Sequence, residues 1–317
     1  MGAGEIVESF RKWVKGSPIP FSAPTTLAHP RKRNAPKVSP GQIRLVALDL
    51  DGTLLASRDV ITPAVHLALR KALDRGVKIV LATARPPRSV RFYHRALKLD
   101  TPIISHNGAL IWDEKKHRII HHESLDHALV WRVIDFVRRR CPDLIISIEI
   151  VDKLYSDHIG LVPADVLPDG CIFNPEVIAG LETFLNVPVT RVMLHGRPSL
   201  IAELMYLLQQ HFGSDLALFN GDSRILLILA PRVNKAVALQ RVASDYGVTR
   251  HEVMAIGDSI NDLPMLRWAG VGVAMANAVD SVQKAVKFVV PSNQHDGVAA
   301  ALQRYVLFES PTEKTGS

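Results

Sequence analysis

Four aspartates and one lysine have the types and spacing that phosphoryl transfer requires. Asp49 and Asp51 stand two residues apart directly after an apolar segment, and Asp258 and Asp262 stand one helical turn apart. A carboxylate can attack phosphorus and form an aspartyl phosphate, and a second acid can protonate the leaving oxygen. Because carboxylates repel an anionic ester, such a site needs a divalent cation, and Mg²⁺ prefers oxygen ligands. Lys235 would offset charge on the transferring oxygens.

Five further polar or turn-forming residues complete this candidate site. Thr83 and Arg85 follow one short apolar segment, Asn107 and Gly108 follow the next, and Asn261 lies between the two late aspartates. Each also has an ordinary structural interpretation, because threonine caps helices and Asn-Gly sequences favour tight turns. The convergence of several complementary roles favours a functional site over a set of unrelated turns.

Short apolar segments alternate with helical patterns in the residues that flank the middle of the chain. In the first part, strands are predicted at 43–50, 77–82 and 102–105, with helices at 62–75 and 89–99. In the last part, helices at 234–246, 261–268, 278–285 and 297–305 alternate with strands at 253–256, 271–274 and 288–290. This alternation predicts an α/β fold with a doubly wound, mostly parallel, Rossmann-like core formed by residues 43–112 and 230–306. Ligands bind beyond the carboxyl ends of such strands, which is where the candidate residues stand.

The middle of the chain, residues 113–229, has a different pattern. Hairpins are predicted at 109–122 and 144–156, helices at 125–140 and 198–212, and strands at 190–195, 216–219 and 225–229. Hairpins mixed with two long helices predict an inserted α+β cap domain. Its loop at 162–173 is rich in proline and glycine, and we expect this loop to carry substrate specificity.

Residues 1–42 form a basic, proline-rich segment that we expect to be disordered or loosely packed, as we expect of residues 307–317. The segment holds seven lysines or arginines and two glutamates, so it accounts for five of the seven net positive charges of the chain. The excess charge therefore lies outside the predicted domains, and we expect no nucleic-acid partner. A cytoplasmic location is expected, or an organelle stroma or matrix if this segment is a transit peptide.

Two further classes of protein are disfavoured by composition. No apolar run approaches the roughly 18 residues of a membrane-spanning helix, so we expect no membrane partner. The chain has two cysteines, which cannot form the disulfide framework of a small secreted domain. We expect a monomer or a homodimer.

The sequence motifs resemble those of the haloacid dehalogenase superfamily. DLDGTL at 49–54, LATAR at 81–85, NKAVAL at 234–239 and GDSINDLPML at 257–266 are similar to its four motifs in order. HNGALIW at 106–112, VAMANA at 273–278 and HDGVAAAL at 295–302 resemble the Cof-like branch, type IIB. The resemblance covers nearly all of residues 43–306 and implies a Rossmann-like core with a large C2 cap between the second and third motifs.

The resemblance also implies a role for each matching residue. Asp49 would be the nucleophile and Asp51 the general acid, which later serves as base for the hydrolytic water. Mg²⁺ would be bound by Asp49, the carbonyl of Asp51 and Asp258, with Asp262 either ligating or orienting. The residues expected to contact the substrate are Thr83, Arg85, Asn107, Gly108, Lys235 and Asn261, of which Thr83 and Lys235 would hold the phosphoryl group.

Two positions depart from the family pattern, because Ala84 and Ala236 stand where glycine is usual. If either position required a positive φ, alanine would be strained; we expect only a modest change of turn geometry. The sequence thus predicts a Mg²⁺-dependent phosphatase of small phosphorylated metabolites, such as a sugar phosphate, pyridoxal phosphate or a flavin-type phosphate. The alternatives are a phosphomutase of phosphorylated sugars and a non-catalytic ligand-binding protein on the same scaffold.

Overall fold

The protein is described here by a computed structural model that covers residues 39 and 41–308, apart from 58, 160, 161, 164, 167–172, 185 and 186. The described residues fall into two compact units. We call 39–124 together with 232–308 the core unit, and 125–231 the inserted unit. The predictions for residues 1–38 and 309–317, and for most of the 162–173 loop, lie outside the described residues.

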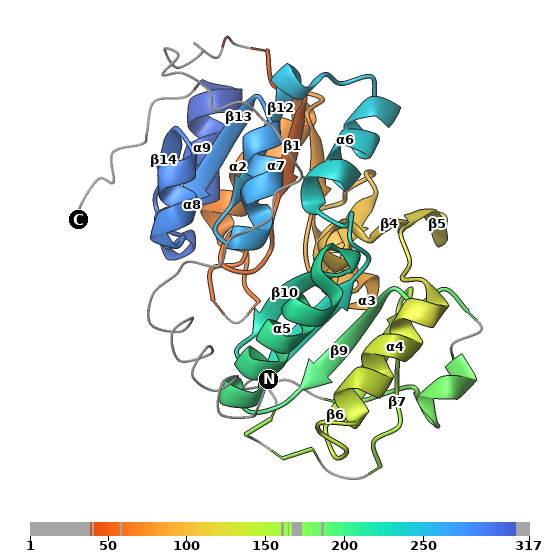
Figure 1. Ribbon diagram of the computed structural model, residues 1–317. Coiled ribbons are helices and arrows are strands. Elements are labelled where there is room, and N and C mark those ends of the chain that lie inside the picture. The colour runs from red at the N-terminus through yellow and green to blue at the C-terminus, as the bar shows by residue number, and fades with distance from the viewer. Residues whose placement is uncertain are drawn as a thin grey trace. The chain divides into compact units, whose positions relative to one another are not determined.

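The core unit is built on a five-stranded, fully parallel sheet with the order β14-β13-β12-β1-β2 (Figure 1). Its strands are β1 (Leu45–Leu48), β2 (Lys78–Leu81), β12 (Val253–Gly257), β13 (Val271–Met275) and β14 (Phe288–Val290). Along β1 the side chains alternate between two buried clusters, with Val46 and Leu48 in one and Leu45 and Ala47 in the other. Burial on both faces explains why the strands are apolar throughout, and it confirms the doubly wound prediction.

Helices cover both faces of this sheet. Residues of α2 (Pro63–Asp74), α3 (Pro87–Ala96) and α9 (Gly297–Leu302) share one apolar cluster. Residues of α6 (Lys235–Asp245), α7 (Leu263–Trp268) and α8 (Asp280–Ala285) share the other. The predicted start of α2 is confirmed, because Thr62 Oγ1 accepts the Val65 amide at 3.3 Å and Pro63 is the first helical residue.

A three-stranded antiparallel sheet completes the core unit. It consists of β3 (Ile103–Ser105), β4 (Leu110–Asp113) and β5 (Arg118–His122). A parallel bridge between Ala82 and Ile104 places β3 beside the end of β2. The hairpin that the sequence assigned in part to the cap thus belongs to the core unit, and the division falls at Ser124 and Leu125 rather than at residue 113.

The inserted unit is a six-stranded sheet accompanied by two long helices, α4 (His127–Arg138) and α5 (Pro198–Phe212) (Figure 1). Its strand order is β10-β11-β9-β6-β7-β8, and every pair is antiparallel except β7 with β8. The strands are β6 (Ile145–Ile150), β7 (Lys153–Ser156), β8 (Val177–Ile178), β9 (Arg191–His195), β10 (Ala217–Asp222) and β11 (Ile225–Leu229). The predicted α+β character is confirmed. None of the described helices combines the length and the apolar composition of a membrane-spanning segment.

Candidate active site

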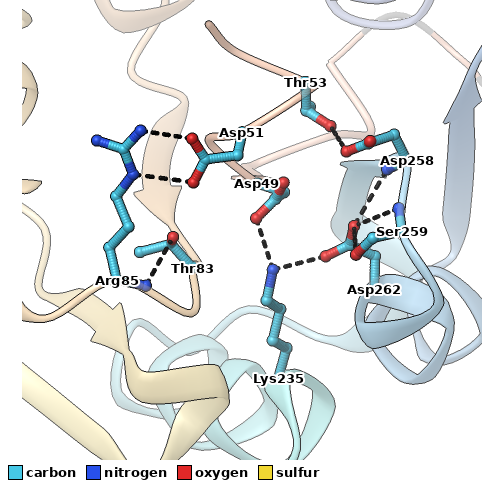
Figure 2. A network of polar contacts seen from close by, with 9 residues as sticks. All are labelled: Asp49, Asp51, Thr53, Thr83, Arg85, Lys235, Asp258, Ser259 and Asp262. Atoms are coloured by element: carbon cyan, nitrogen blue, oxygen red, sulfur yellow. Dashed lines mark hydrogen bonds and ion pairs between the residues drawn. The ribbon is translucent and has the colours of Figure 1, made fainter. Parts of the chain in front are cut away.

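The candidate residues gather where parallel strands of the core unit end (Figure 2). Asp49 directly follows β1 and Asp258 directly follows β12, and these two strands pair in parallel. The Asp49 amide continues the ladder by donating to the carbonyl of Ile256 at 3.1 Å. The two aspartates therefore leave the sheet on neighbouring strands, as the strand-end argument predicts.

Lys235 joins two of the carboxylates. Its ammonium donates to Oδ1 of Asp49 and to Oδ1 of Asp262, at 2.6 Å in each case. Lys235 is the first residue of α6, whose start is fixed by Asn234, since the Asn234 side chain accepts the Val237 amide. Burial by itself would lower the pKa of Lys235, but Asp262 and Asp49 outweigh it and raise this pKa. The lysine is therefore a buried cation in the middle of the acidic cluster.

Asp262 is held from two sides. Its Oδ2 accepts the amides of Asp258 and Ser259, at 3.1 and 2.9 Å, and the Ser259 hydroxyl at 2.9 Å. Its Oδ1 accepts from Lys235, so both oxygens already have protein donors. A Cβ on Gly257 would lie 2.6 Å from the Asp262 Cβ, so glycine is required where β12 ends against this residue.

Three carboxylates of the cluster can supply oxygen atoms within 4.8 Å of one another, from Asp49, Asp258 and Asp262. Burial and then the neighbouring Asp262 raise the pKa of Asp49. Burial also raises the pKa of Asp258 to about 6, although a 2.8 Å hydrogen bond from Thr53 opposes this. One lysine does not balance two buried acids and a half-buried third, and the oxygen-rich donor set therefore fits a divalent cation such as Mg²⁺.

Gly52 makes the close approach of two loops possible. Its φ is +77°, and a Cβ at this position would lie 2.3 Å from Oδ2 of Asp258. The side-chain amide of Asn277 donates to the Gly52 carbonyl at 2.8 Å, which ties the loop after β1 to the segment after β13. Only glycine satisfies both the backbone conformation and the contact.

Asp51 faces Arg85 rather than Lys235 (Figure 2). Arg85 Nε donates to Oδ2 of Asp51 at 2.9 Å, and Nη2 donates to Oδ1 of the same carboxylate. The same Nη2 also donates to Oδ1 of Asp59 at 2.7 Å. The hydroxyl of Thr83 accepts the Arg85 amide at 3.1 Å, so Thr83 shapes the turn that presents the arginine.

The Asn107-Gly108 turn packs between two parts of the site. The Asn107 amide donates to the Thr83 carbonyl at 2.9 Å, and a Cβ on Gly108 would lie 2.5 Å from the carbonyl of Asn234, the residue before Lys235. Asn107 is only 1% exposed, yet its carboxamide has no hydrogen-bond partner within the described residues. Asn261 lies half-buried in the turn Ile260–Asp262.

The residues with polar side-chain contacts at the site include several that were not among the sequence predictions, such as Thr53, Asp59, Ser259 and Asn277. Ser259 had a readable signal, because Ser-x-x-Asp from 259 to 262 is a capping-box sequence, and the structure forms that box. Thr53, Asp59 and Asn277 act through contacts distant in sequence. Ala84 and Ala236 are absent from the positive-φ residues of the described chain, and Ala236 is helical, so neither alanine strains the backbone.

Comparisons with known proteins identify the family of the chain. A family model described as haloacid dehalogenase-like hydrolase matches residues 46–302. The chain is 31% identical over 268 residues to the 5-amino-6-(5-phospho-D-ribitylamino)uracil phosphatase YitU of Bacillus subtilis, covering 82% of this chain and 97% of that protein. It is also similar to a solved phosphatase of the haloalkanoate (HAD) enzyme superfamily from Bacteroides thetaiotaomicron. That similarity has a TM-score of 0.70 and 25% identity, and covers 86% of this chain and 99% of the other.

A subclass IIB sugar phosphatase of known structure shares the fold, with a TM-score of 0.66 and 20% identity over 83% of this chain and 98% of the other. The acidic strand ends, the buried lysine and the matched family model lead to one conclusion. This chain belongs to the haloacid dehalogenase-like hydrolases, in their Cof-like branch, and it is a phosphoric monoester hydrolase.

Proposed function

We propose that the chain is a Mg²⁺-dependent phosphatase of small phosphorylated metabolites that works through a phosphoaspartyl intermediate on Asp49. The observation that carries this proposal is the acidic cluster in which the buried Lys235 donates a hydrogen bond to Asp49. An oxygen of Asp258 lies within 4.8 Å of an oxygen of Asp49. Lys235 occupies Oδ1 of Asp49, which orients the carboxylate so that its other oxygen can face phosphorus. A carboxylate in this position is a suitable nucleophile for an ester held at the strand ends.

Asp49 and Asp258, with the backbone carbonyl of Asp51, would hold the Mg²⁺. When bound, the cation would offset the negative charge that the acids and the ester bring together. Asp262 would position Lys235 and the turn after β12, because its oxygens already accept four hydrogen bonds. All four aspartates lie within one unit of the chain, and Asp49 and Asp262 are buried there.

Asp51 would donate a proton to the leaving oxygen and afterwards take one from the attacking water. Thr83 and Lys235 would hold the phosphoryl oxygens. Asn107 supports a substrate contact, because a buried carboxamide without a partner is costly unless a ligand satisfies it. Arg85, Gly108 and Asn261 would complete the surroundings of the ester.

The substrate class follows from the relatives. Several of them are named as phosphatases of 5-amino-6-(5-phospho-D-ribitylamino)uracil, and one of these is 31% identical to this chain. We propose a phosphorylated metabolite with an alkyl phosphate group, and this flavin precursor is the first compound to test.

Activity against a panel of phosphorylated metabolites with Mg²⁺ tests the proposal, with kcat/KM as the readout. Asp49→Asn should lose essentially all turnover, because the amide is a poor nucleophile. Asp100→Asn is the matched control, since Asp100 is an exposed aspartate of the core unit paired with Lys78. Unchanged turnover in Asp49→Asn would refute the nucleophile, and an isomerised sugar phosphate instead of free phosphate would identify a mutase.

A further inference from the structure

Asp59 and Tyr93 are polar residues at the site that the proposed chemistry does not use. Asp59 Oδ1 accepts from Nη2 of Arg85 at 2.7 Å, and the Tyr93 hydroxyl is hydrogen-bonded to Asp59. The centre of the Tyr93 ring lies 6.0 Å from the Arg85 guanidinium carbon. Arg85 is therefore shared between two carboxylates, because its Nη2 donates to both Asp51 and Asp59, and the Tyr93 ring lies beside it.

The local backbone explains how Asp59 reaches the arginine. Asp59 has a φ of +68°, a left-handed conformation that aspartate tolerates better than most residues. Two backbone hydrogen bonds close the loop around Asp59: the Val60 amide donates to the Ser57 carbonyl, and the Ala56 amide donates to the Val60 carbonyl. Tyr93 comes from α3, where its ring is packed into the core and only 6% exposed. One of the two supports is thus anchored in the hydrophobic core.

The consequence for catalysis lies in the geometry of Asp51. This carboxylate is 57% exposed and its hydrogen bonds to Arg85 are what orient it. A guanidinium fixed by a second carboxylate presents its donors in one direction, whereas one held only by Asp51 would move together with Asp51. A general acid must lie within hydrogen-bond reach of the leaving oxygen, so small displacements lower the rate.

We infer that Asp59 and Tyr93 are positioning residues that fix Arg85 and, through it, the general acid Asp51. This inference rests on the proposed function, because it assigns Asp51 the role of general acid. The inference concerns protonation of the leaving oxygen, a step that limits the rate only for substrates whose leaving group needs a proton.

Two substrates separate positioning of the acid from every other effect. Ribitol 5-phosphate releases an alcohol and requires protonation of its leaving oxygen, whereas p-nitrophenyl phosphate releases a phenolate that is stable as an anion. The quantity to compare is kcat/KM, since it reports the step in which the leaving group departs and not the later hydrolysis of the aspartyl phosphate. The variants are Asp59→Ala and Tyr93→Phe.

We expect each variant to lower kcat/KM for ribitol 5-phosphate about tenfold, and for p-nitrophenyl phosphate by less than about twofold. Asp100→Ala removes an exposed aspartate from another ion pair, and Tyr305→Phe removes a buried hydroxyl that has no hydrogen-bond partner in the described structure. Both controls should leave both substrates unaffected. The thermal unfolding midpoint of each variant shows whether the core unit remains folded.

Equal losses on the two substrates, or none on either, would overturn the inference while leaving the phosphatase proposal intact. An inactive wild-type protein, or a fully active Asp49→Asn, would instead defeat the proposed function itself. The ratio of the two kcat/KM values is therefore the decisive number, because a variant that merely loses folded protein changes both values by the same factor.

Discussion

Replacing Gly52 with alanine tests whether the close contact between the two acidic loops controls the proposed metal site. The added Cβ would lie 2.3 Å from Oδ2 of Asp258, whereas an ordinary contact is at least 3.4 Å. The Asp258 carboxylate must therefore move by about 1 Å, and its 2.8 Å hydrogen bond from Thr53 would be lost or lengthened. The positive φ adds a separate backbone cost of about 1 kcal/mol.

These two costs can be separated with a matched glycine. Gly76, at the end of α2, has a φ of +80°, close to the +77° of Gly52, but a Cβ there would meet nothing within 4 Å. Both glycines belong to the core unit. Gly76→Ala should therefore lose about 1 kcal/mol of unfolding free energy and retain full activity, which isolates the backbone term.

For Gly52→Ala we expect the Mg²⁺ concentration that gives half-maximal activity to rise about tenfold, equivalent to about 1.4 kcal/mol. At saturating Mg²⁺, kcat/KM should fall by about a hundredfold, because a displacement of about 1 Å misaligns the reacting groups. Activity is titrated with Mg²⁺ and unfolding is followed with denaturant for both variants. If Gly52→Ala matched Gly76→Ala in stability, metal requirement and activity, the steric reasoning would be wrong.

Two further outcomes follow from buried polar groups. Asn107→Gly can keep the positive φ of 56° and removes a carboxamide that has no hydrogen-bond partner among the described residues. We expect kcat/KM to fall about tenfold, which corresponds to the loss of one hydrogen bond to a charged ligand. Unchanged kinetics would exclude a contact between Asn107 and the substrate. Burial, and then Arg191, lower the pKa of His195 from 6.5 to about 4, so the unfolded chain binds more protons between these values. The free energy of unfolding of the inserted unit should therefore fall by up to about 3 kcal/mol as the pH drops from 6.5 to 4. Hydrogen exchange of the β9 amides should show this pH dependence in the wild type and lose it in His195→Gln. The control is His66→Gln, which replaces an exposed histidine and should keep the pH dependence.

The sequence identified most elements because their local signals agree with their tertiary surroundings. Helix α5 occupies the predicted residues 198–212, and α2 begins after the predicted cap Thr62. Strand β8 was not predicted, since two residues carry no periodicity and pair only because β7 lies beside them. The two units divide at Ser124 and Leu125 instead of at residue 113, a difference that the sequence could not indicate because a hairpin pattern is the same whichever unit it joins.

The candidate site divides in the same way. Asp49 and Asp258 could be paired from sequence, because strand ends of one parallel sheet share an edge. The sequence could not predict that Arg85 is shared between Asp51 and Asp59, because this contact depends on the left-handed backbone of Asp59 in an irregular loop. Local sequence gives the residue types at the edge of the sheet, whereas the partners of each side chain are set by loops whose conformation is not periodic.

Asp262 shows why this distinction matters for chemistry. From spacing alone it could either bind the cation or orient its neighbours, because one helical turn places it on the same side as Asp258. Its oxygens, however, accept from the Asp258 and Ser259 amides, the Ser259 hydroxyl and Lys235. A direct bond to the metal would compete with these donors at a residue that is fully buried. Its charge instead helps to raise the pKa of Lys235, whose ammonium it directs at Asp49, and this supports the proposal that Asp49 and Asp258 would be the carboxylates that hold a cation.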